Sequence, residues 1–265
     1  MEVKSDNKRR RFFPDAPYYP VTRFIPNLAT LVGLSIGLTA VNFALLAQWE
    51  KAMWAILIAT AFDGLDGRLA RFFKASSRFG AELDSLSDFV TFGVSPALVI
   101  FLYSVQALGT KGWICLLIYC MCAGLRLARF NTVSIEEDYN LEAKVITEKP
   151  KGFFQGVPMP AAALLLLMPL MISVENDVYI PPLVFAIFLL VVGGLMVSST
   201  PTYSFKGMNI RRAHVVPLLA TVMVALIGII SSPWETLPII GVVYLATFPF
   251  SIRSYKRQIS ETTSK

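Results

Sequence analysis

Four aspartates lie in apolar stretches of this 265-residue sequence, at spacings that group them into two pairs. Asp63 and Asp66 are three residues apart and Asp84 and Asp88 are four apart, so within helices each pair shares one helix face. A carboxylate at membrane depth is costly and needs a partner or a water-filled cavity. One such residue could be a structural hydrogen-bonding group, but four that converge cannot all stay ionised unless cations neutralise them. Because oxygen-only ligands favour hard divalent ions, the sequence predicts a two-metal site for Mg²⁺ or Mn²⁺, with Ca²⁺ also open.

The residues around the aspartates indicate what the metals would hold. Gly64, Gly67 and Ala70 leave a helix face open, so a bulky group can lie against the backbone. Arg71 and Arg78 add guanidinium groups, whose geometry suits phosphate. Helix packing explains any one of the glycines equally well, but the combination of small residues, cations and metals fits a nucleotide diphosphate.

Eight apolar stretches are long enough, or nearly so, to cross about 30 Å of hydrocarbon, and inside a membrane they must be helices. The second and third carry the aspartates, and their short connection makes them antiparallel neighbours with all four carboxylates at one depth. The sequence thus predicts an all-α polytopic membrane protein with about eight transmembrane helices. The eight stretches are Asn27–Gln48, Ala52–Phe73, Phe79–Leu108, Trp113–Phe130, Pro158–Val174, Ile180–Ser198, Val215–Ser231 and Leu237–Ile252.

Composition supports this class and excludes others. Hydrophobic residues make up 55% of the chain and charged residues 16%, whereas a soluble domain carries about a quarter charged residues. The mean hydropathy of +0.59 likewise argues against a soluble enzyme or a disordered chain. Residues 21–253 are expected to form one transmembrane catalytic domain, between a basic tail (1–20) that is too polar for a cleavable signal peptide and a polar tail (254–265).

The lysines and arginines predict the orientation. With the N-terminus in the cytoplasm, 22 of the 24 fall on the cytoplasmic side and only Lys51 and Lys111 fall outside. We therefore expect both termini and the aspartates to face the cytoplasm. The net charge of +6 is explained by this asymmetry, so no nucleic-acid partner is expected.

Other potentially reactive residues have simpler interpretations. The three cysteines, Cys115, Cys120 and Cys122, fall in one apolar stretch, and we expect them to act as small buried hydrophobic residues. The single histidine, His214, reads as an interfacial residue in a basic loop. Gly33 and Gly37 form a GxxxG pair, which usually serves packing within one chain and leaves a homodimer open.

One spaced pattern resembles the motif of the CDP-alcohol phosphatidyltransferase family at every position: Asp63-x-x-Asp66-Gly67-x-x-Ala70-Arg71, eight residues, then Gly80-x-x-x-Asp84-x-x-x-Asp88. The resemblance implies six core transmembrane helices and a cytoplasm-facing site, with two metals, that displaces CMP from a CDP-linked lipid. It also implies roles for the carboxylates. Asp63 and Asp84 would bridge both metals, Asp66 would complete one, and Asp88 would complete the other and act as general base.

The same resemblance assigns contacts with the CDP-linked lipid. It extends back to Pro26–Thr30, which looks like the family's first-helix segment near the nucleotide. The residues it implies for binding CDP-diacylglycerol are Asn27, Thr30, Gly67, Ala70, Arg71, Ser77 and Gly80.

Three further segments, Asp88–Pro96, Arg126–Asn131 and Gly156–Ala162, resemble phosphatidylserine synthases of the integral-membrane type. They imply transfer of the phosphatidyl group from CDP-diacylglycerol to L-serine at the cytoplasmic membrane. Arg126, Arg129 and Asn131 would then contact serine, although anchoring at the membrane surface explains the two arginines as well.

Two alternatives remain open from the sequence. Within the same family the acceptor could be glycerol 3-phosphate or inositol, and Arg126, Arg129, Arg211 and Arg212 could build the extra basic pocket that a phosphorylated acceptor needs. A cation transporter would also place carboxylates in the membrane, but it would not explain the small residues and arginines spaced around them.

Overall fold

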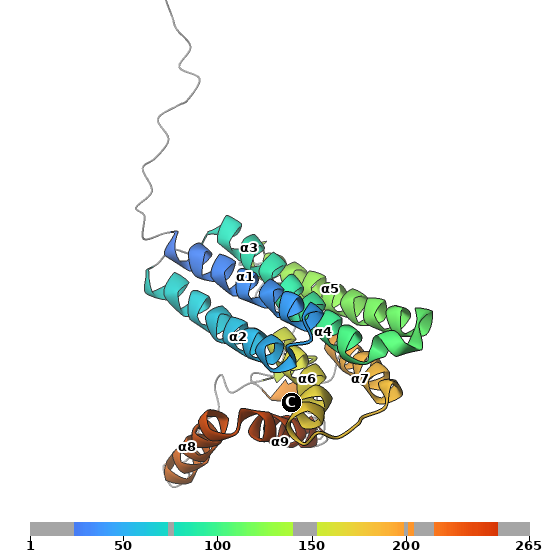
Figure 1. The fold of residues 1–265 in the computed structure, drawn as a ribbon. Coiled ribbons are helices and arrows are strands. Elements are labelled where there is room, and N and C mark those ends of the chain that lie inside the picture. Colours follow the sequence, from blue (N-terminus) through green and yellow to red (C-terminus); the bar gives the residue numbers. More distant parts are fainter. Residues whose placement is uncertain (1–23, 74–76, 140–152, 199–200, 204–214, 249–265) are drawn as a thin grey trace, which may run out of the picture.

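The computed structural model describes residues 24–73, 77–139, 153–198, 201–203 and 215–248. The expected terminal tails, 1–20 and 254–265, lie wholly outside these ranges, as do Arg211, Arg212 and His214. Within them the chain is helical apart from one short two-stranded ladder, which confirms the helical class (Figure 1). The helices are α1 (Ile25–Leu45), α2 (Trp49–Phe72), α3 (Arg78–Asp88), α4 (Ser95–Tyr103), α5 (Thr110–Tyr139), α6 (Met159–Glu175), α7 (Pro182–Val197), α8 (Val215–Ser231) and α9 (Pro233–Ala246).

Each of the eight expected stretches coincides with a helical segment. The third is a composite of α3, a π-helical segment η2 (Phe89–Val94) and α4, followed by the 3₁₀ turn η3 (Val105–Leu108). Three helical segments in the described part are both long and apolar enough to cross a membrane: Ile25–Leu45, Phe79–Tyr103 and Thr110–Thr132. Helix α2 is long enough but carries the Asp63 pair together with arginines, and α6 to α9 are apolar but shorter.

Helix α1 packs along α2 and also contacts α3, η2 and α4 (Figure 1). Its GxxxG glycines serve these contacts. A Cβ on Gly33 would lie 3.3 Å from Phe62 Cβ on α2, and one on Gly37 would lie 2.7 Å from Thr91 Cγ2 on η2. The pair therefore supports packing within one chain, and its sequence pattern gives no support for a dimer.

The centre of the bundle is α6, whose side chains are mostly buried against α4, α7, α9 and η2. The strands β1 (Phe153–Gln155) and β2 (Pro201–Tyr203) pair antiparallel and join the segment before α6 to the segment after α7. Helix α8 contains no buried residue and packs against α9, away from α1 to α3 (Figure 1).

The π-helical segment η2 follows Asp88 directly, and the backbone groups it releases are satisfied by side chains. Pro96 has no N–H to donate to the Phe92 carbonyl, which instead accepts a 3.2 Å hydrogen bond from the buried Tyr119 hydroxyl. The Ser95 hydroxyl donates to the Val90 carbonyl at 3.0 Å. Irregular backbone at membrane depth is tolerated only when such partners exist. These bonds stabilise η2 directly after Asp88.

Candidate active site

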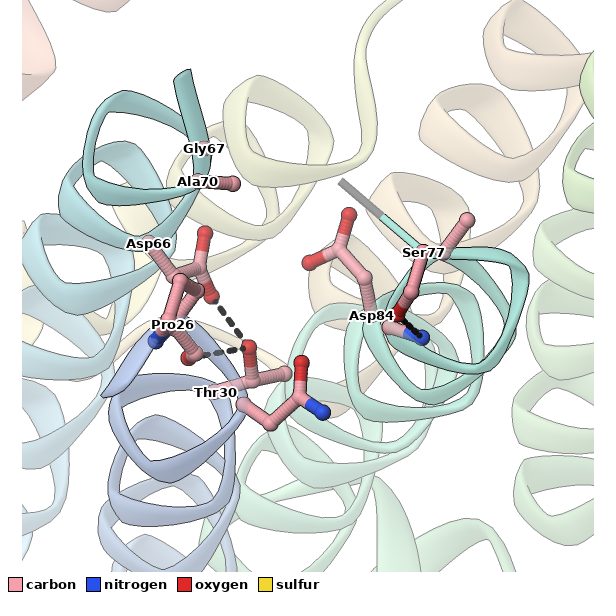
Figure 2. Close-up of a pocket in the computed structure, with 10 residues that line it drawn as sticks. Pro26, Thr30, Asp66, Gly67, Ala70, Ser77 and Asp84 are labelled. Carbon is pink, nitrogen blue, oxygen red and sulfur yellow. Dashed lines mark hydrogen bonds between the residues drawn. The ribbon is translucent and has the colours of Figure 1, made fainter. Parts of the chain in front are cut away.

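A pocket of about 150 Å³ lies where α1, the end of α2 and the start of α3 meet, and we call it the outer pocket. Figure 2 shows Asp66 on α2 and Asp84 on α3 on opposite sides of it. Six of the seven residues expected to bind the CDP-lipid line this pocket, although they come from three separate elements. Its lining residues are Pro26, Asn27, Thr30, Asp66, Gly67, Ala70, Ser77, Gly80, Ala81 and Asp84.

Three of the four expected metal ligands converge. Asp63, Asp66 and Asp84 each offer a carboxylate oxygen, and these oxygens all lie within 4.8 Å of one another. Asp66 is buried, with 5% of its surface exposed, and the other two are half-buried. Such a set of hard oxygen donors fits Mg²⁺, Mn²⁺ or Ca²⁺, and the mutual repulsion of the three charges favours a bound cation.

The fourth carboxylate, Asp88, lies beside this group and not within it. It is one turn beyond Asp84 on α3, and its carboxyl group is in hydrogen-bonding contact with that of Asp63. The structure thus separates three clustered oxygens from a fourth carboxyl group that lies next to Asp63. A metal-ligand role and a proton-accepting role are both compatible with this position.

Thr30 on α1 orients Asp66. Its hydroxyl lies 2.8 Å from Asp66 Oδ2, to which it donates, and 3.1 Å from the Pro26 carbonyl oxygen (Figure 2). Both side chains are buried. The bond therefore fixes one rotamer of a metal-ligand candidate from a neighbouring helix.

The start of α3 is held against α1 by a capping bond and a close approach. The Ser77 hydroxyl accepts a 3.0 Å hydrogen bond from the Gly80 N–H, as an N-cap residue does. A Cβ on Gly80 would lie 2.9 Å from Asn27 Oδ1, so a larger residue here would displace the Asn27 side chain. The N-terminus of α3, which carries the positive end of the helix dipole, consequently faces the outer pocket.

The glycines of α2 leave open space, as expected, but neither arginine is seen to contact the outer pocket in the described part of the structure. A Cβ on Gly64 or Gly67 would meet no atom within 4 Å. Arg71 is exposed and is not among the residues that line the outer pocket, because its Nε donates back to the Gly67 carbonyl at 3.1 Å. The side chain of Arg78 lies outside the described part of the structure.

The residues expected to contact serine all lie on α5, but they differ in their exposure and in their contacts. Arg126 is half-buried and interacts electrostatically with Asp88. Arg129 is exposed. The side-chain amide of Asn131 is hydrogen-bonded at 3.3 Å to the hydroxyl of Ser85, the residue after Asp84. Arg126 and Asn131 therefore approach the carboxylates, whereas Arg129 faces outward.

Gly156 supports the surroundings of Arg126. Its φ of +74° lies in the left-handed region, and a Cβ there would be 2.6 Å from the Met196 carbonyl oxygen and 3.3 Å from Arg126 Nη1. Only glycine fits both constraints. The turn before α6 therefore lies directly against the arginine and the end of α7.

The sequence did not single out Ser87 and Thr91 as site residues. Both are buried and line a second, smaller cavity of about 10 Å³ on the inner side of the carboxylates, which we call the inner cavity. The available signal was polarity within the apolar run that follows Asp88. The residues lining the inner cavity are Thr30, Gly33, Ala59, Asp63, Asp66, Ser87, Asp88, Thr91 and Phe92.

Comparison with known proteins places this geometry in a family context. Residues 23–197 match the family model described as CDP-alcohol phosphatidyltransferase, and residues 214–249 match one described as CDP-alcohol phosphatidyltransferase 2. A protein of Mycobacterium bovis named CDP-diacylglycerol–serine O-phosphatidyltransferase is 34% identical over 88% of this chain and 80% of its own length. A protein of Helicobacter pylori with the same name is 30% identical over 86% of this chain and 90% of its own length. One of Methanocaldococcus jannaschii, also so named, is 37% identical over 53% of this chain and 61% of its own.

Proposed function

The chain belongs to the CDP-alcohol phosphatidyltransferase family, and from this premise we propose that it transfers the phosphatidyl group of CDP-diacylglycerol to the hydroxyl of L-serine. The products are phosphatidylserine and CMP. The structural observation that carries the proposal is the convergence of Asp63, Asp66 and Asp84 within 4.8 Å at a pocket lined by the expected nucleotide-binding residues. The choice of serine follows the names of relatives that cover most of the chain.

The carboxylates would hold two divalent ions, Mg²⁺ or Mn²⁺. Asp63 and Asp84 would serve both ions, Asp66 the first and Asp88 the second, as the family resemblance implies. When bound, the ions neutralise the β-phosphate and stabilise CMP as the leaving group. Phosphoryl transfer depends mainly on positioning and charge neutralisation, so rigid placement of the carboxylates by helix packing and by Thr30 is what the protein supplies.

Asp88 acts as the general base in this proposal. It accepts the proton of the serine hydroxyl as the oxygen attacks the phosphorus. Its place beside Asp63 supports the assignment, because the attacking oxygen must approach the phosphate next to the metals. Arg126 interacts electrostatically with Asp88, so a serine carboxylate held by Arg126 would have its hydroxyl near the base. Asn131 and the exposed Arg129 complete the proposed acceptor site.

The CDP moiety of the donor lies in the outer pocket. Asn27, Thr30, Ser77 and Gly80 line its α1 and α3 sides, and the α2 side is lined by Gly67 and Ala70. The open space above Gly67 admits the nucleotide close to the backbone. Arg71 reaches the diphosphate by leaving its present bond to its own helix, a change that an exposed side chain makes easily.

We also propose the membrane arrangement. All eight helical segments cross the bilayer, six of them forming the family core, and residues 21–253 form one catalytic domain with both termini in the cytoplasm. The distribution of lysine and arginine supports this arrangement, and it directs the outer pocket toward the cytoplasm of the cell membrane, where soluble serine and CMP exchange. The largely exposed, apolar α8 would contact membrane lipids or a second copy in a homodimer.

The remaining rival is a different acceptor. Glycerol 3-phosphate or inositol would use the same donor site, and Arg126 and Arg129 would then meet a phosphate in place of a carboxylate. The cation-transporter alternative does not stand, because the chain belongs to a transferase family.

An acceptor panel tests the proposal. The purified full-length protein is given CDP-diacylglycerol, Mn²⁺ or Mg²⁺, and one of L-serine, glycerol 3-phosphate or inositol, and CMP and the lipid product are measured. We expect metal-dependent CMP release with serine and formation of phosphatidylserine. Transfer to glycerol 3-phosphate or inositol without transfer to serine would overturn the acceptor assignment and leave the family reaction intact.

A further inference from the structure

The inner cavity lies one helical turn deeper than the outer pocket. Gly33 follows Thr30 on α1, Asp63 precedes Asp66 on α2, and Asp88 follows Asp84 on α3. Its volume of about 10 Å³ corresponds to roughly one water molecule. The lining includes three carboxyl groups and three hydroxyl groups, so a water there would find several hydrogen-bonding partners.

Thr91 presents an unusual hydroxyl to this cavity. Its side chain is 2% exposed, and its Oγ1 is the single buried side-chain oxygen or nitrogen without a hydrogen-bond partner among the described residues. Other threonines within the helices use their hydroxyls locally: those of Thr39 and Thr60 donate to the carbonyl four residues earlier, at 2.7 and 2.8 Å. A buried unsatisfied hydroxyl is destabilising, so a partner outside the protein is expected.

The π-helical backbone explains why Thr91 differs. In η2 the usual spacing of carbonyls around the helix is disturbed, and Ser95 bonds the carbonyl five residues earlier instead of four. Gly37 lets α1 approach so closely that its missing Cβ would lie 2.9 Å from Thr91 Oγ1. The hydroxyl is thereby confined between α1 and the carboxylates. π-helical segments are frequent at functional sites, and this one begins immediately after Asp88.

We propose that Thr91 binds an ordered water in the inner cavity and, through it, positions the carboxyl group of Asp88 for the acceptor reaction. Thr91 is then a positioning residue, since it touches neither substrate nor metal. The water forms hydrogen bonds with Thr91 Oγ1 and with the carboxyl groups that also line the inner cavity. This inference rests on the proposed function for its catalytic consequence, but the water site itself does not depend on any reaction.

The test compares Thr91→Val, which keeps the side-chain shape and removes the hydroxyl, with Thr91→Ser, which keeps the hydroxyl. Thr60→Val is the matched control, because its hydroxyl bonds its own helix and lines neither cavity. In the purified full-length protein we expect Thr91→Val to lower kcat for serine about five- to tenfold, as loss of one positioning hydrogen bond does. The KM values for serine and CDP-diacylglycerol and the Kd for Mn²⁺ should stay within about twofold. Thr91→Ser should restore kcat.

A second measurement uses the metal-free protein without substrate. If water fills the inner cavity, Thr91→Val removes one of its partners and lowers the Tm by about 2–4 °C. If the hydroxyl is unpartnered in solution, its removal leaves the Tm unchanged or raises it, and the inference is wrong. Should valine disturb the packing against Gly37, the pair Thr91→Ser and Thr91→Ala makes the same comparison without the methyl group.

Three further outcomes separate the possible roles of Thr91 from the proposed function. A hundredfold weaker Mn²⁺ affinity in Thr91→Val would make Thr91 a metal ligand and overturn the water assignment. Unchanged kcat in Thr91→Val, in a wild type that forms phosphatidylserine, would overturn the positioning role while leaving the proposed function in place. A wild type that does not use serine would refute the proposed acceptor, and the Tm comparison would still decide the water site.

Discussion

The hydroxyl of Thr30 donates a 2.8 Å hydrogen bond to Oδ2 of Asp66, across the contact between α1 and α2. Both side chains are buried, so the bond is not replaced by solvent when it is lost. One carboxylate oxygen of Asp66 belongs to the cluster with Asp63 and Asp84. A residue of the first helix thus determines the orientation of a carboxylate on the second.

Thr30→Val tests this link. Removal of the hydroxyl frees Asp66 to rotate away from the metal position, so the Kd for Mn²⁺ should rise roughly ten- to a hundredfold, in line with the loss of one hydrogen bond to a charged group. Isothermal titration measures this. The control is Thr39→Val on the same helix, where the exposed hydroxyl bonds only its own backbone. An equal effect in both variants would contradict the specific role.

Substitution of one clustered aspartate should sharply weaken metal binding. Asp63→Asn or Asp84→Asn removes one charged ligand that is proposed to bridge two ions, so divalent binding and nearly all CMP release should disappear. Glu82→Gln is the control, because Glu82 is exposed on α3 and lines neither cavity. Activity near the wild-type level in either aspartate variant would refute the two-metal site.

Asp88→Asn should distinguish the proton-accepting role of Asp88 from a role in binding the metals and the donor. Because Asp88 lies outside the group of three oxygens, CDP-diacylglycerol should still bind through Asp63, Asp66 and Asp84. Turnover should nevertheless collapse, since the serine hydroxyl loses its proton acceptor. Equilibrium binding of the donor and steady-state CMP release measure the two effects. Loss of donor binding together with turnover would show that Asp88 is mainly a ligand.

The two arginines of α5 should differ in their effect on serine. Arg126→Ala should raise the KM for serine roughly ten- to a hundredfold with donor affinity unchanged, because a lost charged hydrogen bond costs about 1.5–3 kcal/mol. The position of Arg126 against Gly156, within electrostatic range of Asp88, favours the larger effect there. Arg129→Ala should raise the same KM less, because Arg129 is exposed. If neither substitution changes the serine KM, the acceptor site lies elsewhere.

The membrane arrangement is tested by labelling single cysteines in a variant without Cys115, Cys120 and Cys122. Cysteines placed at Ser77 and Asn140 should react from the cytoplasmic side, and those at Gly109 and Asn176 from the other side. Ser77, Gly109 and Asn176 lie at helix ends in the structure, and all three are exposed. Labelling of Ser77 and Gly109 from one side would contradict the eight-span arrangement.

The sequence predicted the helical segments and the carboxylate pairs because both depend on local geometry. Apolar length predicts a helix in a membrane, and the spacing within Asp63/Asp66 and Asp84/Asp88 fixes a shared face on each helix. The short connection between the two pairs also brings them together without knowledge of the rest of the fold. Gly80 was predicted as part of a motif, and the structure gives the reason, which is the approach of Asn27.

Tertiary packing determined the relative positions of side chains on helices that are distant in sequence, because these positions depend on how each helix is rotated and how deep it lies. It grouped Asp84 with the α2 pair and left Asp88 to one side, it turned Arg126 inward and Arg129 outward, and it enclosed Thr91 behind the carboxylates. These outcomes result from many contacts among α1, η2, α5 and α6, to which no single spacing in the sequence corresponds. The sequence by itself therefore determined which groups carry the chemistry, and only the packed helices determined which of them meet, because side chains reach one another through the sum of all helix contacts.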